Sequence, residues 1–281
     1  LVQTSTPKYL LKKRGYVCKT KDNIGKMRDN KYCTLWEDYI IIPRYSQKNM
    51  KNKNQRLMTF SKNIDRTEAK GEHKFYLAFS KKYIIGKNVL NVGSWTGPYE
   101  SIAHTYVKKM TAVDIEKRAL SVLKKNLPDV ICVKAFSHKL PFPDSSFDVI
   151  CFWDVIEHIP SGYELATLFE INRVLKKGGY LFLATPHANL LSKVFDPAYF
   201  LAGHRHYSDD SLVLMLKDTG FKIEKVLHRG SFFSSFYALS FYFFKHILQM
   251  KMPSIKWIED KMEKDISSSG YIQIVVRAKK N

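Results

Sequence analysis

The stretch KNVLNVGSWTGPYE, residues 87–100, decides the fold class that we predict for this chain. A short apolar run is followed by Gly93 and Gly97 and then by a segment typical of a helix. Glycines at such a turn let the backbone approach a ligand, and a helix N-terminus offers free N–H groups to an anion. Asp114 ends the next apolar run, 21 positions after Gly93, about where a carboxylate accepts hydrogen bonds from ribose hydroxyls. The pattern predicts a site for a nucleoside-containing cofactor.

Short apolar runs of the β type alternate with helix-length segments from residue 88 onward. This alternation is expected of an α/β sheet. The predicted strands are residues 88–92, 110–114, 130–134, 147–152, 179–185, 222–227 and 271–278. The predicted helices are residues 100–109, 117–126, 163–177 and 209–220. The last of these helices ends at Gly220, a residue type that commonly follows a helix.

The composition is that of a folded protein with a strong excess of positive charge. The 281 residues are 45% hydrophobic, and 46 Lys and Arg against 26 Asp and Glu give a formal net charge of +20. Such a charge favours anionic partners: nucleic acid, phosphorylated substrates or an acidic membrane surface. The four cysteines form no C-x-x-C pair, so reduced thiols are expected rather than a zinc knuckle or a disulfide framework.

Two regions stand apart from the predicted α/β domain, residues 71–281. Residues 1–70 hold 17 Lys and Arg and 6 Asp and Glu, and they are predicted to be a basic extension: a solvated face, or a surface for RNA or acidic lipid. Residues 229–270 contain the aromatic run 231–244 and are predicted to be a cap insertion, with an interfacial membrane helix or an oligomer contact as alternatives. No apolar run reaches 18 residues, so we expect a cytoplasmic protein, with peripheral association at the inner membrane surface as an option.

Five motifs, in order along the chain, resemble those of the class I S-adenosylmethionine-dependent methyltransferases of the broad small-molecule type. They are VLNVGSWTG (89–97), AVDIE (112–116), LPFPDSSFDVICFWDVIEHI (140–159), EINRVLKKGGYLFLATPH (170–187) and GFKIEKVL (220–227). The resemblance covers about residues 70–279 and is similar in kind to glycan and quinone methyltransferases. It implies a Rossmann-like sheet of seven mostly parallel strands with an antiparallel last strand, helices on both faces, and S-adenosylmethionine as cofactor.

The resemblance also implies which residues bind the cofactor. They are Asn91, Gly93, Ser94, Trp95, Gly97, Asp114, Ile115, Phe136, Ser137 and Trp153. Asn91 stands where the family usually has an acidic residue that helps to hold the amino group of the cofactor, and Trp95 stands where a glycine is usual. The acidic residue often found near the adenine maps onto Phe136 or Ser137, so we expect the Phe136 ring and backbone groups to recognise the base.

Histidines at the predicted strand ends are the candidates for the catalytic base, because histidine titrates near neutral pH and these ends converge on the ligand crevice. Our order of preference is His187, His158, His204 and His206. The stretch 184–208 resembles a substrate lid of related sugar and lipid methyltransferases, and His204, Arg205 and His206 in it are predicted to bind substrate. Arg205 could clamp a phosphate or carboxylate, although a purely structural loop is the alternative.

Asp154, Glu157 and His158 match the spacing of an acidic-x-x-Glu-His run that binds a divalent metal in some quinone methyltransferases. A Glu-His pair after this strand is also widespread in metal-independent relatives, and we predict no metal. The predicted function is methyl transfer, at oxygen, to a small-molecule, glycan or lipid-linked acceptor. The alternatives are an RNA methyltransferase that uses the basic extension, and a degenerate binding protein, which Asn91 and Trp95 suggest.

Overall fold

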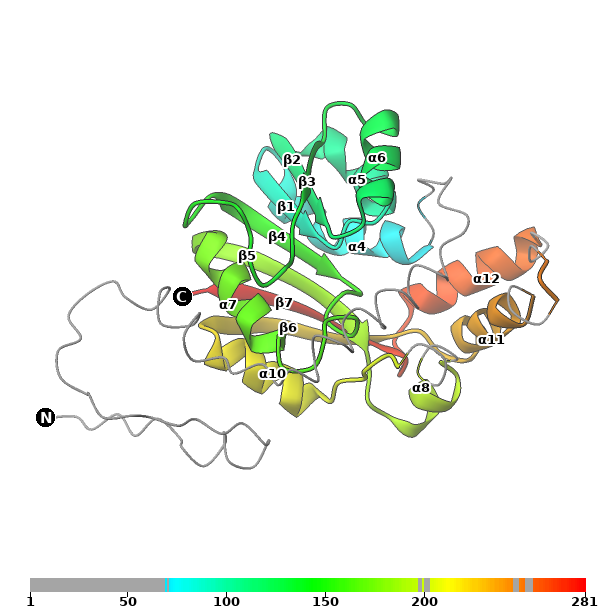
Figure 1. Ribbon diagram of the computed structural model, residues 1–281. Helices are drawn as coiled ribbons and strands as arrows, with labels where there is room; N and C mark the ends of the chain where they lie inside the picture. The colour runs from blue at the N-terminus through cyan, green and yellow to red at the C-terminus, as the bar shows by residue number, and fades with distance from the viewer. Residues whose placement is uncertain (1–68, 70, 197–198, 200–202, 245–247, 251–254) are drawn as a thin grey trace, which may run out of the picture. The chain divides into compact units, whose positions relative to one another are not determined.

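A computed structural model describes residues 69, 71–196, 199, 203–244, 248–250 and 255–281 (Figure 1). The predicted basic extension, residues 1–70, lies outside the described residues apart from Ala69. Within the described part, seven strands form one sheet in the order β3-β2-β1-β4-β5-β7-β6. The strands are β1 (Asn88–Val92), β2 (Lys109–Asp114), β3 (Ile131–Lys134), β4 (Phe147–Trp153), β5 (Leu175–Pro186), β6 (Phe221–Arg229) and β7 (Gln273–Lys280).

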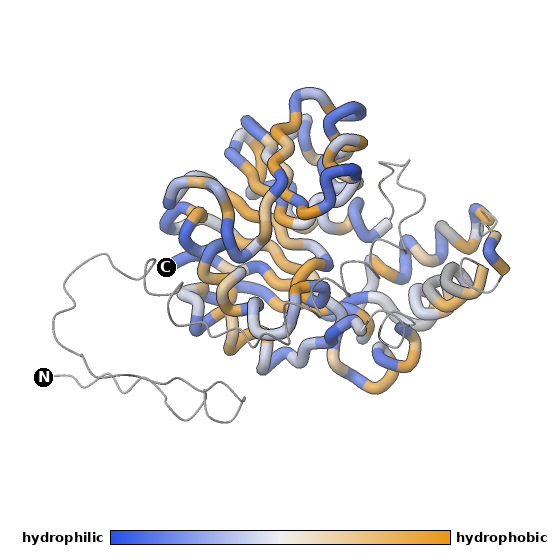
Figure 2. Tube along the Cα trace, viewed as in Figure 1, coloured by the Kyte–Doolittle hydropathy of each residue, from blue (hydrophilic) through white to orange (hydrophobic). Residues whose placement is uncertain are grey.

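The sheet is parallel except for its last strand, as predicted. Neighbouring strands from β3 to β5 pair in parallel, whereas β7 lies antiparallel to both β5 and β6. The central strands are apolar along nearly their whole length because both faces of a parallel sheet are covered. Figure 2 shows these apolar strands at the centre of the domain.

Helices cover both faces of the sheet, as predicted. Val89, Cys151 and Phe182 point to one face, where α4 (Gly71–Ile84), α5 (Pro98–Ala103) and α6 (Lys117–Asn126) complete a buried apolar cluster. Alternate residues, such as Ile150 and Leu183, point to the opposite face. There α7 (Glu164–Val174) contacts β5, and α10 (Asp209–Asp218) contacts β6.

Three predicted helices are longer than the observed ones. The helix predicted at 209–220 ends two residues earlier, at Asp218. The helix predicted at 100–109 ends at Ala103, and a 3-10 turn, His104–Tyr106, follows it before β2 begins. The helix predicted at 163–177 ends at Val174, because Leu175 already pairs with Phe147 of β4. The strand pairing therefore overrides the helical periodicity at the end of α7.

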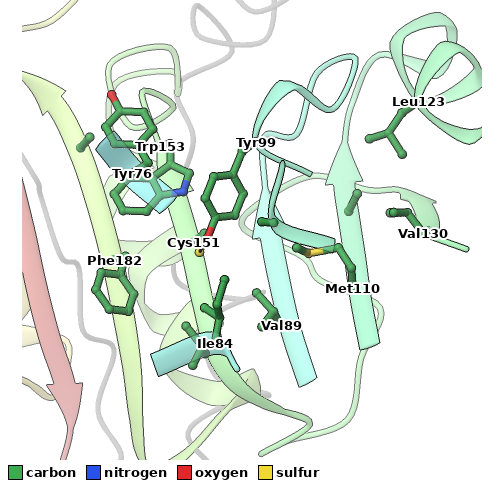
Figure 3. Close-up of a cluster of buried hydrophobic side chains, with 14 of the residues drawn as sticks. Tyr76, Ile84, Val89, Tyr99, Met110, Leu123, Val130, Cys151, Trp153 and Phe182 are labelled. Atoms are coloured by element: carbon green, nitrogen blue, oxygen red, sulfur yellow. Dashed lines mark hydrogen bonds between the residues drawn. The ribbon is translucent and has the colours of Figure 1, made fainter. Parts of the chain in front are cut away.

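An aromatic cluster joins α4 to the carboxyl end of β4. Tyr76 stacks on Trp153 with the ring centroids 4.3 Å apart and an interplanar angle of 1°. Figure 3 shows Tyr99 and Phe182 beside this pair, with the hydroxyl of Tyr99 directed at Cys151. The Cys151 thiol donates to that hydroxyl over 3.5 Å. The cluster holds the end of β4, and the residues that follow it, in a fixed position beside the turn after β1.

The predicted cap region folds as helices between β6 and β7. It contains α11 (Phe232–Tyr242) and α12 (Lys256–Ser267), which contact each other, and α12 also contacts α4. Asp265 accepts hydrogen bonds from the backbone N–H groups of Ser231 and Ser234, both at 2.9 Å, and from both serine hydroxyls. Although burial raises the pKa of Asp265, these bonds bring it below its usual value. This carboxylate fixes the start of α11 to the end of α12.

Candidate functional site

The turn between β1 and α5 has a left-handed backbone at three positions. The φ angles are 81° at Gly93, 51° at Trp95 and 84° at Gly97. A residue with a side chain costs about 1–3 kcal/mol in this conformation, so Trp95 keeps at some cost the backbone that a glycine would adopt freely. Its N–H donates to the carboxylate of Asp114 over 2.8 Å, which supports the strained residue.

Glycine is required at both ends of this turn for a steric reason as well. A Cβ atom on Gly93 would lie 2.2 Å from Cγ2 of Val155, which follows β4. A Cβ atom on Gly97 would lie 2.7 Å from Cγ of Leu123 on α6. Both distances are far below van der Waals contact, so the two glycines let the turn close against β4 and α6.

Asp114 ends β2 beside the turn. One carboxylate oxygen accepts from the N–H of Trp95, and the other accepts from the N–H of Glu116, each at 2.8 Å. Burial raises the pKa of Asp114, and these backbone hydrogen bonds oppose that rise. Each oxygen retains a lone pair, so Asp114 can accept hydrogen bonds from a pair of ligand hydroxyls while it shapes the turn.

Asn91 and Glu100 form a buried polar pair under the turn. The side-chain N–H of Asn91 donates to Oε1 of Glu100 over 2.7 Å, and the two residues are 3% and 0% exposed. Within the described part of the chain, Oδ1 of Asn91, Oε2 of Glu100 and Oγ of Ser94 are buried without a hydrogen-bond partner. Because unpaired buried polar atoms are costly, this group is suited to a polar ligand that completes their hydrogen bonds.

Sequence reasoning missed Glu100 as a site residue. The signal was present: an acidic residue in the first turn of the helix after the glycine turn, in a chain whose strand has asparagine where the family usually has an acid. The structure joins these two residues directly. The acidic side chain that is absent at position 91 is therefore available from position 100.

The Glu100 carboxyl predicts a pH-dependent stability. Burial raises its pKa from 4.5 to about 7. Between these values the folded state holds a proton that the unfolded chain has released, so the free energy of unfolding falls as the pH rises from about 4.5 to 7, by about 3 kcal/mol in total. The free energy of unfolding, measured with urea at pH 5 and pH 8, should fall by more in the wild type than in Glu100→Gln. An equal fall in both proteins would contradict the prediction.

The remaining predicted cofactor residues fall into two groups. Ile115 and Phe136 follow the neighbouring strands β2 and β3, and their side chains are 40% and 52% exposed. Ser137 lies next to Phe136, and its hydroxyl is 3.2 Å from that of Thr167. Trp153 instead belongs to the aromatic cluster and is only 7% exposed. The first group presents apolar surface at the sheet edge, whereas Trp153 packs inside.

The four candidate histidines form two separate groups. His187 follows β5, with its ring 4.8 Å from that of His228. The other three lie together: His158 meets the ring of His204 edge-on, with the ring centroids 4.4 Å apart. One oxygen of Asp196 lies 3.2 Å from Nδ1 of His204 and 2.9 Å from Nε2 of His206. Nδ1 of His206 also lies 3.1 Å from the backbone carbonyl of His187. The backbone of His187 therefore touches the Asp196 network, whereas its ring faces His228.

The two carboxylates of the predicted Asp-x-x-Glu-His run accept hydrogen bonds from different protein groups. Asp154, with a φ of 53°, accepts from the Tyr76 hydroxyl over 2.5 Å and from the Gln273 amide over 2.6 Å. Burial raises the pKa of Asp154 to about 6. Glu157 accepts from the Thr185 hydroxyl over 3.1 Å, and burial raises its pKa well above the usual value of a glutamate. These residues do not form a three-ligand cluster in the described chain.

Arg205 uses its guanidinium to bind other residues of this chain. Its guanidinium pairs with the Glu164 carboxylate and donates to the carbonyls of Ile156, at 2.8 Å, and Ile159. Arg205 therefore fastens the segment after β4 to the start of α7. A role in binding substrate stays a prediction.

The fold and the glycine turn place the chain in a known class. The family described as "Methyltransferase domain" matches residues 48–226, and the chain belongs to it. The strand order and the antiparallel β7 are those of the class I S-adenosylmethionine-dependent methyltransferase fold. The prediction from the five motifs is confirmed.

The curated relatives are named as methyltransferases. A "Probable S-adenosylmethionine-dependent methyltransferase" of Mycobacterium tuberculosis (strain H37Rv) is 29% identical over 135 residues, which are 48% of this chain and 48% of the relative. A ubiquinone/menaquinone biosynthesis C-methyltransferase of Shewanella sp. (strain ANA-3) is 32% identical over 145 residues, 45% of this chain and 55% of the relative. The chain spans about half the length of the curated relatives it matches.

Solved structures agree on the fold. The [4+2]-cyclase SpnF is similar with a TM-score of 0.54 and 18% identity, over 74% of this chain and 80% of that one. A SAM-dependent methyltransferase from Methanosarcina mazei is similar with a TM-score of 0.52 and 16% identity, over 72% of this chain and 96% of that one. At these identities the likeness concerns the fold alone.

Proposed function

We propose that this protein transfers the methyl group of S-adenosylmethionine to an oxygen of a small-molecule, glycan or lipid-linked acceptor, with a histidine as general base. The observation that carries the proposal is the set of unpartnered buried atoms of Asn91, Ser94 and Glu100 beneath the glycine turn. They lie beside the carboxylate-supported turn of Asp114, so the residues present fit a cofactor that has an ammonium, a carboxylate and ribose hydroxyls.

Each residue around the turn would bind a different part of the cofactor. The free oxygen of Glu100, beside Asn91, would accept from the ammonium, and the two oxygens of Asp114 would accept from the ribose hydroxyls. The exposed side chains of Ile115 and Phe136 would contact the faces of the base. When bound, the cofactor supplies an activated methyl group, so the protein has to orient the acceptor and remove its proton.

His187 is suited to remove that proton. Its Nδ1 lies 3.0 Å from the Asn189 amide nitrogen and 3.3 Å from the carbonyl oxygen of Tyr271. In the tautomer with the proton on Nδ1, that N–H donates to the carbonyl and the Nε2 lone pair is available. Its Nε2 lies 4.0 Å from the carboxylate of Asp209, which would stabilise the imidazolium formed by proton removal. A positioned general base of this kind contributes about 100- to 10,000-fold to a rate.

Exposed apolar side chains at the same sheet edge support an acceptor with a lipid part. α8 (Leu190–Val194) follows the carboxyl end of β5, and α11 follows that of β6, which is parallel to β5. The apolar rim consists of the exposed residues Leu190, Leu191, Val194, Phe233 and Phe236. Such a patch on a strongly basic protein fits an anionic membrane surface. No helix in the described residues has the length and apolarity needed to cross a membrane.

Calorimetry and an acceptor assay test this function. We expect S-adenosylmethionine and S-adenosylhomocysteine to bind one-to-one, and labelled methyl groups to pass to glycans or lipid-linked sugars. Lipid-linked sugars in vesicles that contain anionic phospholipid should be methylated faster than the same sugars without the lipid, dissolved in buffer. Equal rates would remove the membrane part of the proposal, and a lack of cofactor binding would remove the enzymatic part.

A further inference from the structure

Three side chains from separate elements face one another at the carboxyl edge of the sheet. His187 follows β5, His228 lies at the end of β6, and Asp209 begins α10. One oxygen of Asp209 is 2.9 Å from Nε2 of His228 and 4.0 Å from Nε2 of His187. The ligand atoms of all three lie within 4.8 Å of one another. Among the described residues, no other group of three or more such side chains comes this close.

We propose that these residues bind a divalent transition-metal ion, with zinc as the preferred ion. Two imidazoles and one carboxylate are a ligand set that zinc uses with bonds of about 2.0–2.2 Å. Ligand atoms around one ion then stand about 3–3.5 Å apart, and the distances of 2.9 and 4.0 Å bracket this value. Small side-chain movements would therefore complete the site. Three protein ligands leave a coordination position open for water or another oxygen donor.

A second contact orients His187 for this role. Its Nδ1 lies 3.3 Å from the carbonyl oxygen of Tyr271 and 3.0 Å from the Asn189 amide nitrogen, and that amide also donates to the same carbonyl. In the tautomer with the proton on Nδ1, the ring N–H donates to Tyr271. A ring N–H donated to a backbone carbonyl is the usual support for a metal-binding histidine, because it directs the other nitrogen to the metal. In His187 that other nitrogen is Nε2, which faces Asp209.

The proposed metal site and the proposed general base use the same atom. Nε2 of His187 cannot hold a metal ion and accept a proton at the same time. The metal proposal does not depend on the proposed function, because its test measures metal binding alone. If the protein does not transfer methyl groups, the metal-site proposal is unaffected. If the metal does not bind, the proposal that His187 is the general base is unaffected.

The test uses the full chain without an affinity tag, after treatment with a chelator. Titration with Co²⁺ should produce the visible absorption of a site with nitrogen and oxygen ligands, and calorimetry with Zn²⁺ should give one ion per chain. Asp209→Asn and His228→Gln each remove a ligand and should weaken Zn²⁺ binding by at least the roughly 10- to 100-fold that the loss of an outer-shell partner costs. Their side chains are 43% and 34% exposed, so both variants should fold. His104→Gln, a histidine bonded within its own helix segment, is the matched control and should bind as the wild type does.

Two results would overturn the proposal. The first is Zn²⁺ binding of wild-type affinity in both Asp209→Asn and His228→Gln, which would place the ion elsewhere. The second is no detectable binding by the wild type at millimolar Zn²⁺ or Co²⁺. The melting temperature of each variant without metal shows whether a loss of binding reflects the missing ligand or an unfolded chain.

Discussion

Replacing His187 with glutamine is expected to lower the turnover number of methyl transfer by about 100- to 10,000-fold, while the affinity for S-adenosylmethionine stays unchanged. Glutamine retains a polar side chain but cannot take up a proton near neutral pH. The proposed cofactor contacts lie at the turn after β1, whereas His187 follows β5, so cofactor binding and turnover should separate. The assay is run with a chelator present, so that the ring acts as a base without a metal ion.

The control for this experiment is His158, the second candidate in our order of preference. His158→Gln should leave turnover nearly unchanged, because the His158 ring packs against His204 in the Asp196 network, apart from His187. Full turnover in His187→Gln would remove His187 from the mechanism. Loss of turnover in His158→Gln alone would transfer the role of base to His158.

Replacing Gly93 with alanine is expected to abolish measurable cofactor binding and to destabilise the fold by about 1–3 kcal/mol. The new Cβ would be strained at a φ of 81° and would meet Val155 at 2.2 Å, so the turn and the segment after β4 would have to move apart. That movement would displace the site formed by Asn91 and Glu100. Calorimetry with S-adenosylhomocysteine measures the loss of affinity, and urea unfolding measures the loss of stability.

Gly86→Ala provides a control with the same backbone strain and no steric clash. Gly86 has a φ of 67°, and a Cβ atom there would have nothing within 4 Å. This variant should lose stability through strain but bind the cofactor normally. Cofactor binding by Gly93→Ala at wild-type affinity would show that the turn does not form the site.

The sequence pattern predicted the framework of the fold closely. β1 has the predicted bounds, and β7 is antiparallel as expected. Apolar runs locate buried strands because burial on both faces leaves little room for polar residues. The predictions were less accurate where long-range pairing decides the structure: Leu175 belongs to β5 because Phe147 pairs with it, which local periodicity does not reveal.

The site was only partly predictable, because its contacts depend on which polar side chains are buried together and on how the elements pack. The glycine turn and Asp114 follow a recognisable spacing. The use of Glu100 depends on burial beside Asn91, and the meeting of Asp209 with His228 depends on how α10 packs on β6. Arg205 carries a charge typical of anion binding, yet its partners Glu164 and Ile156 lie more than 40 residues away in sequence. Motif spacing does not contain such information.

The position of β7 constrains the order in which the chain can fold during synthesis. β7 comes after β6 in the chain but lies between β5 and β6 in the sheet. Until β7 has left the ribosome, β6 has no neighbouring strand and β5 has an unpaired edge. The strands β1 to β5 can already pair with one another at that stage. An incomplete chain would therefore expose an apolar strand edge prone to aggregation, and protection by a chaperone would matter most during that interval.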